Sequence, residues 1–575
     1  MRLIQRIALT SFVLTFFVAP LVAQTGRRED PKVQIAFNRF YDHAEIGEIL
    51  HRLEAAWPKF MKLGSIGKSV EGRELWLMTV NNPQTGPEDR KAAIYIDANV
   101  HGNEVQGAEV CLYTLWYLME NYGKLEEVTK LVDERVFYVL PSVNPDGRDY
   151  WFHHANTSSS SRSGVSPIDS DRDGLFDEDP PNDLDGDGSI TQMRKKVDHG
   201  GTHKLDPDDD RFLVRVKPGE EGDYILLGSE GIDDDGDGRL NEDGVGGYDM
   251  NRSDPSDWQP NYIQFGAGPY PLYWPETRSI ANFLLAHPNI AAVQSYHNSG
   301  GMILRGPGAA SVSEYPRADL AVYDELGRKG QRMLPFYRYM IIHKDLYTVH
   351  GGFVNFAAEG LGIVSFTNEL WASSQAFGGA DRKPDDRKAF NDLIMQGAFY
   401  KKWTPYEHPE FGSIEIGGWN KWSSRVPPPF MLEELCHRNM AFTFLHAKSM
   451  PKPEWGRTSV TDLGGGVRRI RLEIKNPRLI PTRTALAAAK RIGLPDRLTI
   501  EGDSGLRVLG AGFVRGVEPR EVIDPIENDL SVIKLENGIP SKGRVRWEWI
   551  VEGAGPYRVT YRSEKGGILE KTLEP

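Results

Sequence analysis

Cysteine is almost absent from this sequence. Cys111 and Cys436 are the only two in 575 residues, which excludes a fold built on a framework of disulfide bonds. Cys111 is expected to pack in the core, and a single Cys111–Cys436 bridge is the alternative. The sequence also lacks a second apolar run long enough to span a bilayer. A hydrophobic fraction of 39% with 13 Trp argues against a disordered chain, and the length predicts two to four domains.

The first apolar run has the organisation of a secretory signal peptide. Arg2 and Arg6 precede an apolar stretch from Ile7 to Phe17, and Leu21-Val22-Ala23 offers small residues for cleavage after Ala23. Pro20 and the short apolar core disfavour a membrane anchor. Residues 1–23 are therefore predicted to be removed, which places the protein in the periplasm or outside the cell, without a transmembrane segment. A folded pro-domain is not expected, because few residues separate Ala23 from the first predicted element.

Strands and helices alternate over residues 35–450. This order predicts an α/β fold with a mixed central sheet and helices on both faces. Residues 153–246 interrupt it as an insertion rich in Asp and Gly, and residues 455–575 read as an all-β sandwich. The predicted strands are 94–100, 136–140, 290–295 and 363–368, and the predicted helices are 37–58, 275–286, 320–333, 388–403 and 431–447.

Metal-binding side chains stand at the ends of three predicted strands. His101 and Glu104 follow the strand 94–100, His297 ends the strand 290–295, and Glu369 ends the strand 363–368. The carboxyl ends of neighbouring strands meet in one crevice. Two His and one Glu form the open tetrahedral set of a catalytic zinc, and a further Glu can move the proton of a water molecule. HxxE alone is weak evidence, and a surface His beside a solvated Glu is its alternative.

Five ordered motifs make the chain resemble the zinc carboxypeptidases of the carboxypeptidase A type. They are HGNE (101–104), PSVNPDG (141–147), YDMNR (248–252), SYH (295–297) and FTNEL (366–370). The resemblance covers roughly residues 35–450. It implies that His101, Glu104 and His297 bind zinc and that Glu369 is the general base and then the acid.

The resemblance also implies roles for five further residues. Arg194 matches the arginine that stabilises the oxyanion, Asn251 and Arg252 match the pair that holds the substrate carboxylate, and Tyr347 matches a tyrosine that closes over the substrate. Val354 matches the position that tunes the side-chain pocket and favours apolar or neutral residues. The alternatives are a solvated surface Arg194, a structural ion pair for Arg252 and a buried core position for Tyr347. Asn368 departs from the family pattern, in which Phe precedes the glutamate.

The net charge of −13 comes from two short segments, 169–188 and 233–243, with net charges of −8 and −5. They contain three runs with Asp at positions 1, 3 and 5 and Gly at position 6, which is how a tight loop surrounds Ca²⁺. Position 12 is never Glu, so these are not full EF-hands, and a disordered acidic linker is the alternative. The candidate ligands are Asp169, Asp171 and Asp173, then Asp183, Asp185 and Asp187, and finally Asp233, Asp235 and Asp237. Because Arg194 occupies position 12 of the second run, we hypothesise that Ca²⁺ folds the insertion and so positions Arg194 at the cleft.

The sequence thus predicts a secreted zinc metallocarboxypeptidase with Zn²⁺ and Ca²⁺ as cofactors. Its partners would be peptide or protein C-termini, with no nucleic acid, and the partner of the C-terminal domain is not indicated. One alternative is a peptidase or amidase acting on cell-wall stem peptides with the same machinery. A second is a calcium-dependent binding protein with an inactive enzyme fold.

Overall fold

The structure is a computed structural model. It describes residues 30–159, 167, 169, 172–244, 246–372, 386–503, 505–516 and 519–575. The predicted signal peptide, residues 1–23, lies outside the described residues, and so does Asp171. Within the ranges described, the helices are all too short or too polar to cross a membrane.

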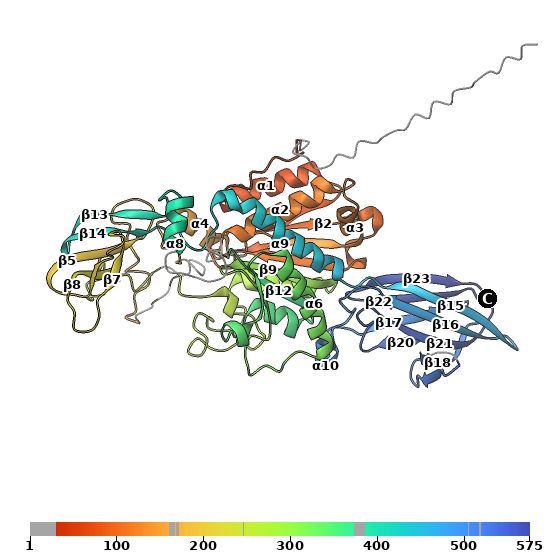
Figure 1. Cartoon of the computed structure of the whole chain (residues 1–575). Helices are drawn as coiled ribbons and strands as arrows, with labels where there is room; N and C mark the ends of the chain where they lie inside the picture. Colours follow the sequence, from red (N-terminus) through yellow and green to blue (C-terminus); the bar gives the residue numbers. More distant parts are fainter. Residues whose placement is uncertain are drawn as a thin grey trace, which may run out of the picture.

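An eight-stranded mixed sheet forms the centre of the molecule (Figure 1). Its inner strands β4, β3, β9 and β12 run parallel, which confirms the predicted α/β fold. In spatial order the strands are β1 (Met61–Lys68), β2 (Glu74–Val80), β4 (Val136–Leu140), β3 (Ala93–Ala98), β9 (Ile290–Asn298), β12 (Val364–Leu370), β10 (Met302–Arg305) and β11 (Arg338–Ile341).

Helices cover both faces of this sheet, so its inner strands are buried on both sides, as parallel strands generally are. Residues of β3 alternate between two cores: Ile94 and Ile96 pack on one side, and Ala93 and Tyr95 on the other. The first face is covered by α1 (His43–Ala56), α2 (Gln106–Asn121), α3 (Glu126–Glu134), α6 (Arg317–Met333) and α9 (Pro429–Ser449). The second is covered by α5 (Pro275–Ala286), α7 (Phe353–Asn355) and the π-helical turn η5 (Phe356–Gly360).

The two cysteines lie in this core as free thiols. Cys111 is on α2 and Cys436 on α9, and both side chains are fully buried. The expected core packing of Cys111 is therefore confirmed, and the alternative of a bridge is wrong.

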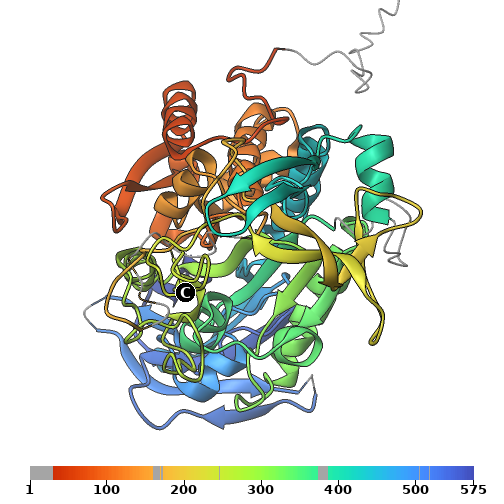
Figure 2. The same cartoon turned by 90° about the vertical axis from the view of Figure 1, so that its left-hand side faces the viewer.

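A second sheet of six strands stands apart from the central sheet at the left of Figure 1 and faces the viewer in Figure 2. It combines four strands of the insertion with a hairpin that follows residue 399. Its order is β13 (Tyr400–His408), β14 (Gly412–Trp419), β5 (Gln192–Gly201), β8 (Gly222–Ser229), β6 (His203–Leu205) and β7 (Leu213–Arg215).

The helix predicted over 388–403 is wrong beyond its first turns. The structure has α8 (Asp386–Ala389) and the π-helical turn η7 (Phe390–Ile394), and then begins the strand β13 at Tyr400. Pairing with β14 decides this conformation, and Pro405 is tolerated because β13 is an edge strand. The spacing of apolar residues within 388–403 does not reveal that this segment pairs with a strand later in the sequence.

The C-terminal region forms two sheets packed face to face, as expected for a β-sandwich. Trp547 and Trp549 are fully buried between them. The first sheet contains β15 (Glu454–Gly464), β16 (Val467–Asn476), β21 (Gly543–Glu552), β18 (Arg507–Arg515) and β19 (Val522–Pro525). The second contains β20 (Val532–Leu535), β17 (Asp496–Glu501), β22 (Tyr557–Ser563) and β23 (Gly567–Leu573).

Hydrogen bonds join this sandwich to the α/β body. Asp319 of α6 accepts from the backbone N–H groups of Ala485 and Leu486, which open the short helix α10 (Ala485–Lys490). The buried Arg135 donates to the backbone oxygens of Met450 and Pro451, in the segment that links α9 to the sandwich. The remaining short elements are η1 (Pro83–Thr85), η2 (Glu88–Arg90), α4 (Pro145–His153), η3 (Met250–Arg252) and η4 (Ile342–Leu346).

Candidate metal centre

Three predicted ligands converge at the carboxyl ends of β3 and β9. The Nδ1 atom of His101 lies 3.0 Å from Oε1 of Glu104, and Nδ1 of His297 lies 3.1 Å from Oε2 of the same carboxylate. The two Nδ1 atoms are 3.3 Å apart. All three side chains are at most 3% exposed, so the donor atoms meet in a small volume that is shielded from solvent.

These distances fit a tetrahedral zinc ion. Ligand atoms about 2.0–2.1 Å from a tetrahedral zinc are roughly 3.3 Å from one another. The two imidazole nitrogens are 3.3 Å apart, and each lies 3.0 or 3.1 Å from one oxygen of Glu104. Two imidazole nitrogens that face each other at this distance present lone pairs unless a proton or a cation lies between them. Although burial disfavours the charged form, both histidines hold the pKa of the Glu104 carboxyl well below its usual value. The donor set therefore suits a divalent cation.

A carboxylate fixes the outer side of His101. The Nε2 atom of His101 lies 2.9 Å from Oδ1 of Asp249, and the backbone N–H of Asn251 donates to the same oxygen at 2.9 Å. A carboxylate on the far nitrogen sets the tautomer of a metal-binding histidine, which leaves Nδ1 to the ion. Asp249 was not among the predicted site residues, although it stands two residues before Asn251 in the YDMNR motif.

The loop between β3 and α2 is shaped by contacts that depend on its residue types. Asn99 adopts a positive φ of 60°, and its side-chain amide donates to the backbone oxygens of His101 and Gly102 at 2.8 and 3.2 Å. A Cβ atom on Gly102 would lie 2.5 Å from the backbone of Gly147. The HGNE loop thus packs directly on the Asn-Pro-Asp-Gly turn, and only glycine fits at that position.

Strand register brings Glu369 beside His297. The two residues are direct partners in the parallel pair of β9 and β12, so their side chains lie on the same face of the sheet. Asn368 consequently points to the opposite face, where its amide bonds to Gln294 at 3.1 Å and Asn439 at 2.8 Å. Asn368 satisfies buried neighbours and does not face the metal centre.

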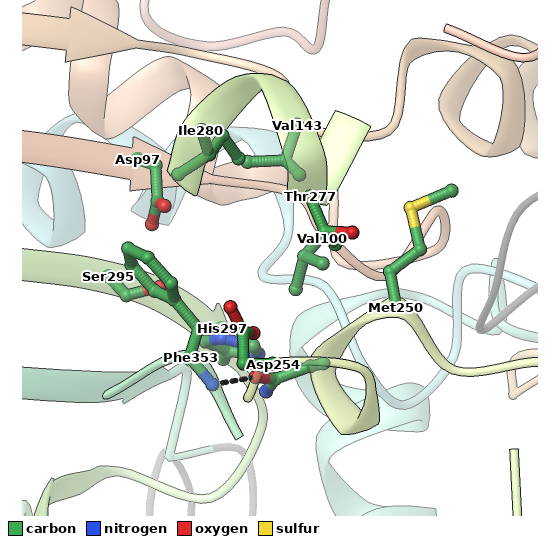
Figure 3. A pocket seen from close by; sticks show the side chains of 11 residues that line it. Asp97, Val100, Val143, Met250, Asp254, Thr277, Ile280, Ser295, His297 and Phe353 are labelled. Carbon is green, nitrogen blue, oxygen red and sulfur yellow. Dashed lines mark hydrogen bonds between the residues drawn. The ribbon is translucent and has the colours of Figure 1, made fainter. Parts of the chain in front are cut away.

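His297 is one of the residues that line a cavity (Figure 3). Two buried carboxyls, Asp97 of β3 and Asp254, line it together with Ser295. Burial raises the pKa of Asp97 to about 6 and the pKa of Asp254 well above its usual value. The cavity is therefore lined by two carboxyl groups that stay protonated to a higher pH than solvent-exposed carboxyl groups do.

Asn251 and Arg252 lie in η3, directly after Asp249. The side-chain oxygen of Asn251 accepts from the backbone N–H of Phe353 at 2.8 Å. Arg252 Nη1 donates to the backbone oxygen of Asn251 at 2.8 Å and is 3.6 Å from Asp249 Oδ2. The pair is thereby fixed beside the carboxylate that orients His101.

Tyr347 and Val354 occupy contrasting environments. The side chain of Tyr347 is 48% exposed, which rules out the alternative of a core tyrosine. Val354 is buried in a small apolar cluster with Met302, Leu304, Met340, Ile342 and Val349. Met302 is also the antiparallel partner of Glu369, so the cluster begins one strand away from the metal centre.

The structure does not bring Arg194 together with the three ligands. Arg194 lies on β5 in the second sheet, and its Nε atom donates to Glu415 at 2.8 Å. Its guanidinium stacks between the rings of Trp403 at 4.2 Å and Tyr224 at 4.7 Å. The side chain is not solvated, so the surface alternative is wrong as well. Strand pairing, which the TQMRKK pattern does not reveal, places Arg194 in this sheet.

The three Asp/Gly runs share one local geometry. In each, the first Asp accepts from the backbone N–H of the Gly at position 6: Asp169 from Gly174 at 3.2 Å, Asp183 from Gly188 at 2.8 Å and Asp233 from Gly238 at 3.0 Å. All three glycines have positive φ values, between 83° and 104°. At the residues described, the first Asp side chain of each run therefore closes a tight turn onto the Gly at position 6.

Comparison with known families agrees with the geometry of the metal centre. The zinc carboxypeptidase family model matches residues 46–196 and 228–381, which is more than half of the chain. The chain therefore belongs to the zinc carboxypeptidase family. Residues 452–574, which form the sandwich, match a domain of unknown function.

Relatives and solved structures give more distant matches. Carboxypeptidase D of Homo sapiens is 32% identical over 122 residues, which is 21% of this chain and 9% of that protein. The inactive metallocarboxypeptidase ECM14 of Saccharomyces cerevisiae is 32% identical over 120 residues, 20% of this chain and 27% of that protein. Carboxypeptidase A of Helicoverpa armigera superposes with a TM-score of 0.44 at 15% identity, covering 73% of this chain and 76% of that one. The chain thus spans only a small part of the curated relatives that it matches.

Proposed function

We propose that this protein is a secreted zinc metallocarboxypeptidase that removes C-terminal residues with apolar or neutral side chains from peptides and proteins. One observation carries the proposal: two imidazole nitrogens 3.3 Å apart each lie within 3.1 Å of one oxygen of the Glu104 carboxylate, beside a glutamate that strand register holds next to His297.

Each residue of the centre has a separate task. His101, Glu104 and His297 would hold the zinc ion, which when bound makes water a stronger nucleophile and polarises a carbonyl group. Glu369 accepts the proton of the attacking water and then passes it to the nitrogen of the leaving amine. Asp249 holds His101 in the tautomer that leaves Nδ1 unprotonated.

Asn251 and Arg252 would select a free C-terminus. A planar guanidinium can pair with both oxygens of a carboxylate, and Arg252 is held beside the metal centre by Asn251 and Asp249. The exposed ring of Tyr347 is free of the core and suits a group that closes over the bound peptide. The apolar cluster around Val354 would receive an uncharged side chain, because it offers no counter-charge to Lys or Arg.

Calcium in the insertion is the second part of the proposal. Asp183, Asp185 and Glu230 present carboxylate oxygens within 4.8 Å of one another, and Oε1 of the fully buried Glu230 makes no hydrogen bond to the described residues. Near the third loop, burial and the neighbouring Asp179 raise the pKa of Glu242 to about 7. Converging carboxylates of this kind suit a hard cation with oxygen ligands. Lys401 already neutralises part of the second loop through Asp185 and Asp187.

A decisive assay compares the free acid and the C-terminal amide of the same peptides. Cleavage of the acid with little turnover of the amide supports a carboxypeptidase, and Arg252→Gln should then raise KM for the acid. Equal cleavage of both forms would favour the alternative, a peptidase or amidase of cell-wall stem peptides. A library of peptides that vary in the terminal residue defines the side-chain preference.

An inactive, calcium-dependent binding protein is the remaining alternative, and one matched relative is itself named inactive. The complete ligand set and Glu369 favour an enzyme. Wild-type protein that holds zinc but cleaves no peptide in the library would favour the binding protein. N-terminal sequencing of the mature protein tests secretion, with a new terminus expected directly after Ala23.

A further inference from the structure

We propose that Arg425 supplies the positive charge that stabilises the oxyanion of the reaction, the role that the family resemblance assigns to Arg194. The inference rests on the proposed function and adds to it a residue from a distant part of the chain. Arg425 lies between β14 and α9, outside all five motifs that carry the resemblance.

The guanidinium of Arg425 lies at the metal centre. Its Nη1 atom is 3.5 Å from Oε1 of Glu104 and 3.3 Å from the backbone oxygen of Asn298, the residue directly after His297. Its side chain is 25% exposed, so it reaches the ligands from the open side of the site. The guanidinium of Arg425 therefore faces both the metal ligands and the solvent.

The backbone of Arg425 is anchored by residues next to the ligands. Its carbonyl oxygen accepts from the side-chain amide of Gln106 at 3.1 Å and from that of Asn298 at 2.9 Å. The backbone N–H of Asn298 in turn donates to Oε2 of Glu104 at 3.1 Å. Two hydrogen bonds therefore hold the backbone of Arg425 to residues beside the ligands, and a third joins one of those residues, Asn298, to Glu104.

The guanidinium keeps donors for a substrate. Contacts of 3.3–3.5 Å are at the long end of hydrogen bonding, and both involve Nη1. Nε and Nη2 make no hydrogen bond to the described part of the chain. Because an arginine has five N–H donors and stays charged, Arg425 can donate to a carbonyl oxygen that enters beside Glu104.

Arg194 is committed elsewhere. It is 5% exposed, paired with Glu415 and enclosed by two aromatic rings in the second sheet. Asn103, the third residue of HGNE, is uncharged and fully buried. The charge that the reaction requires therefore comes from the segment before α9.

The chemical step assigns one task to this residue. Water adds to the carbonyl carbon while Glu369 takes one of its protons, and the electron pair of the C=O bond moves to the oxygen. Arg425 donates hydrogen bonds to that oxygen and loses no proton. The electron pair then returns, the C–N bond breaks, and Glu369 gives its proton to the amine nitrogen. Donors that meet charge only in the transition state lower the barrier without tightening substrate binding.

The test compares Arg425→Gln, Arg425→Lys and Arg425→Ala with Arg194→Gln. Arg328→Gln on the surface of α6, where Arg328 is 74% exposed, is the matched control. We expect Arg425→Gln to lower kcat about 10²–10³-fold with a small change in KM and an unchanged zinc content. Arg425→Lys should recover part of the rate, and added guanidinium ion should partly restore Arg425→Ala.

A second measurement is independent of turnover. A phosphonate peptide carries the charge of the oxyanion, so Arg425→Gln should weaken its binding more than tenfold while the binding of the product peptide stays unchanged. An unaltered kcat and phosphonate affinity would overturn the inference. So would a parallel loss of zinc, which would mean that Arg425 only supports Glu104, or a rate loss confined to Arg194→Gln. Wild-type protein that holds zinc but cleaves no peptide would count against the proposed function instead, and phosphonate binding would then decide the role of Arg425.

Discussion

Nε2 of His101 and Oδ1 of Asp249 are 2.9 Å apart, although 148 residues separate them in the sequence. The contact joins the loop after β3 to η3, which also carries Asn251 and Arg252. The proposed metal ligands and the proposed carboxylate-binding pair therefore share one support, and a change at Asp249 should reach both.

Replacing Asp249 by Ala should lower zinc affinity about 10–100-fold, as is typical when the outer partner of a metal-binding histidine is lost. Competition with a chromophoric chelator measures this affinity. The control is Asp257→Ala, because Asp257 contacts His350 at 2.7 Å, an Asp–His pair outside the ligand set. Equal zinc affinities of the two variants would contradict the role of Asp249.

Glu369→Gln should lower kcat about 10²–10⁴-fold, because the amide cannot accept the proton of water. Zinc content should stay at the wild-type level, since the three donor atoms belong to other residues. Single-turnover kinetics and metal analysis on the same preparation test both statements. Glu407→Gln, an exposed change on β13, is the control, and a variant at 369 that keeps near-wild-type turnover would remove Glu369 from the mechanism.

Removal of calcium should loosen the insertion while zinc is retained. A calcium-selective chelator is expected to open protease sites within residues 172–244 and to lower the melting temperature. Calcium at ten times its Kd would stabilise the folded state by about 1.4 kcal/mol. Asp233→Asn should abolish this response, and Asp208→Asn, in the β6–β7 turn, should preserve it. Unchanged proteolysis with and without the chelator counts against calcium.

Glu276 should make the protein less stable as the pH rises through neutrality. It is fully buried, and burial raises the pKa of its carboxyl to about 7. The folded state therefore holds a proton that the unfolded state releases near pH 4.5. Proton binding by Glu276 thus contributes its full stabilisation below pH 4.5, and this contribution is lost as the pH passes 7. The loss corresponds to about 3 kcal/mol.

Denaturant unfolding at pH 5 and pH 8 measures this effect of Glu276. The fall in the free energy of unfolding between the two pH values should be smaller in Glu276→Gln, which cannot ionise. The matched control is Glu48→Gln, because Glu48 is an exposed residue of α1 and its replacement should leave the fall unchanged. The same fall in wild type and Glu276→Gln would refute the assignment.

Much of the fold follows from local pattern. The strands 136–140 and 290–295, the helix 275–286 and the sandwich after residue 455 all correspond to elements of the structure, because apolar spacing reports burial directly. The strand β13 does not follow from local pattern, because its conformation depends on β14. The second sheet likewise unites β5 and β8 with a hairpin that begins only at Tyr400.

The sequence by itself determined the metal chemistry of this protein. His101 and Glu104 follow one predicted strand, and His297 and Glu369 end two others. The strand ends alone therefore predict which groups share the crevice. Only the tertiary structure decided which arginine reaches them. Arg425 contacts Glu104 although 321 residues separate them in the sequence, while strand pairing holds Arg194 in the second sheet. A contact between residues so far apart in the chain depends on how the whole chain folds, and no local sequence pattern encodes it.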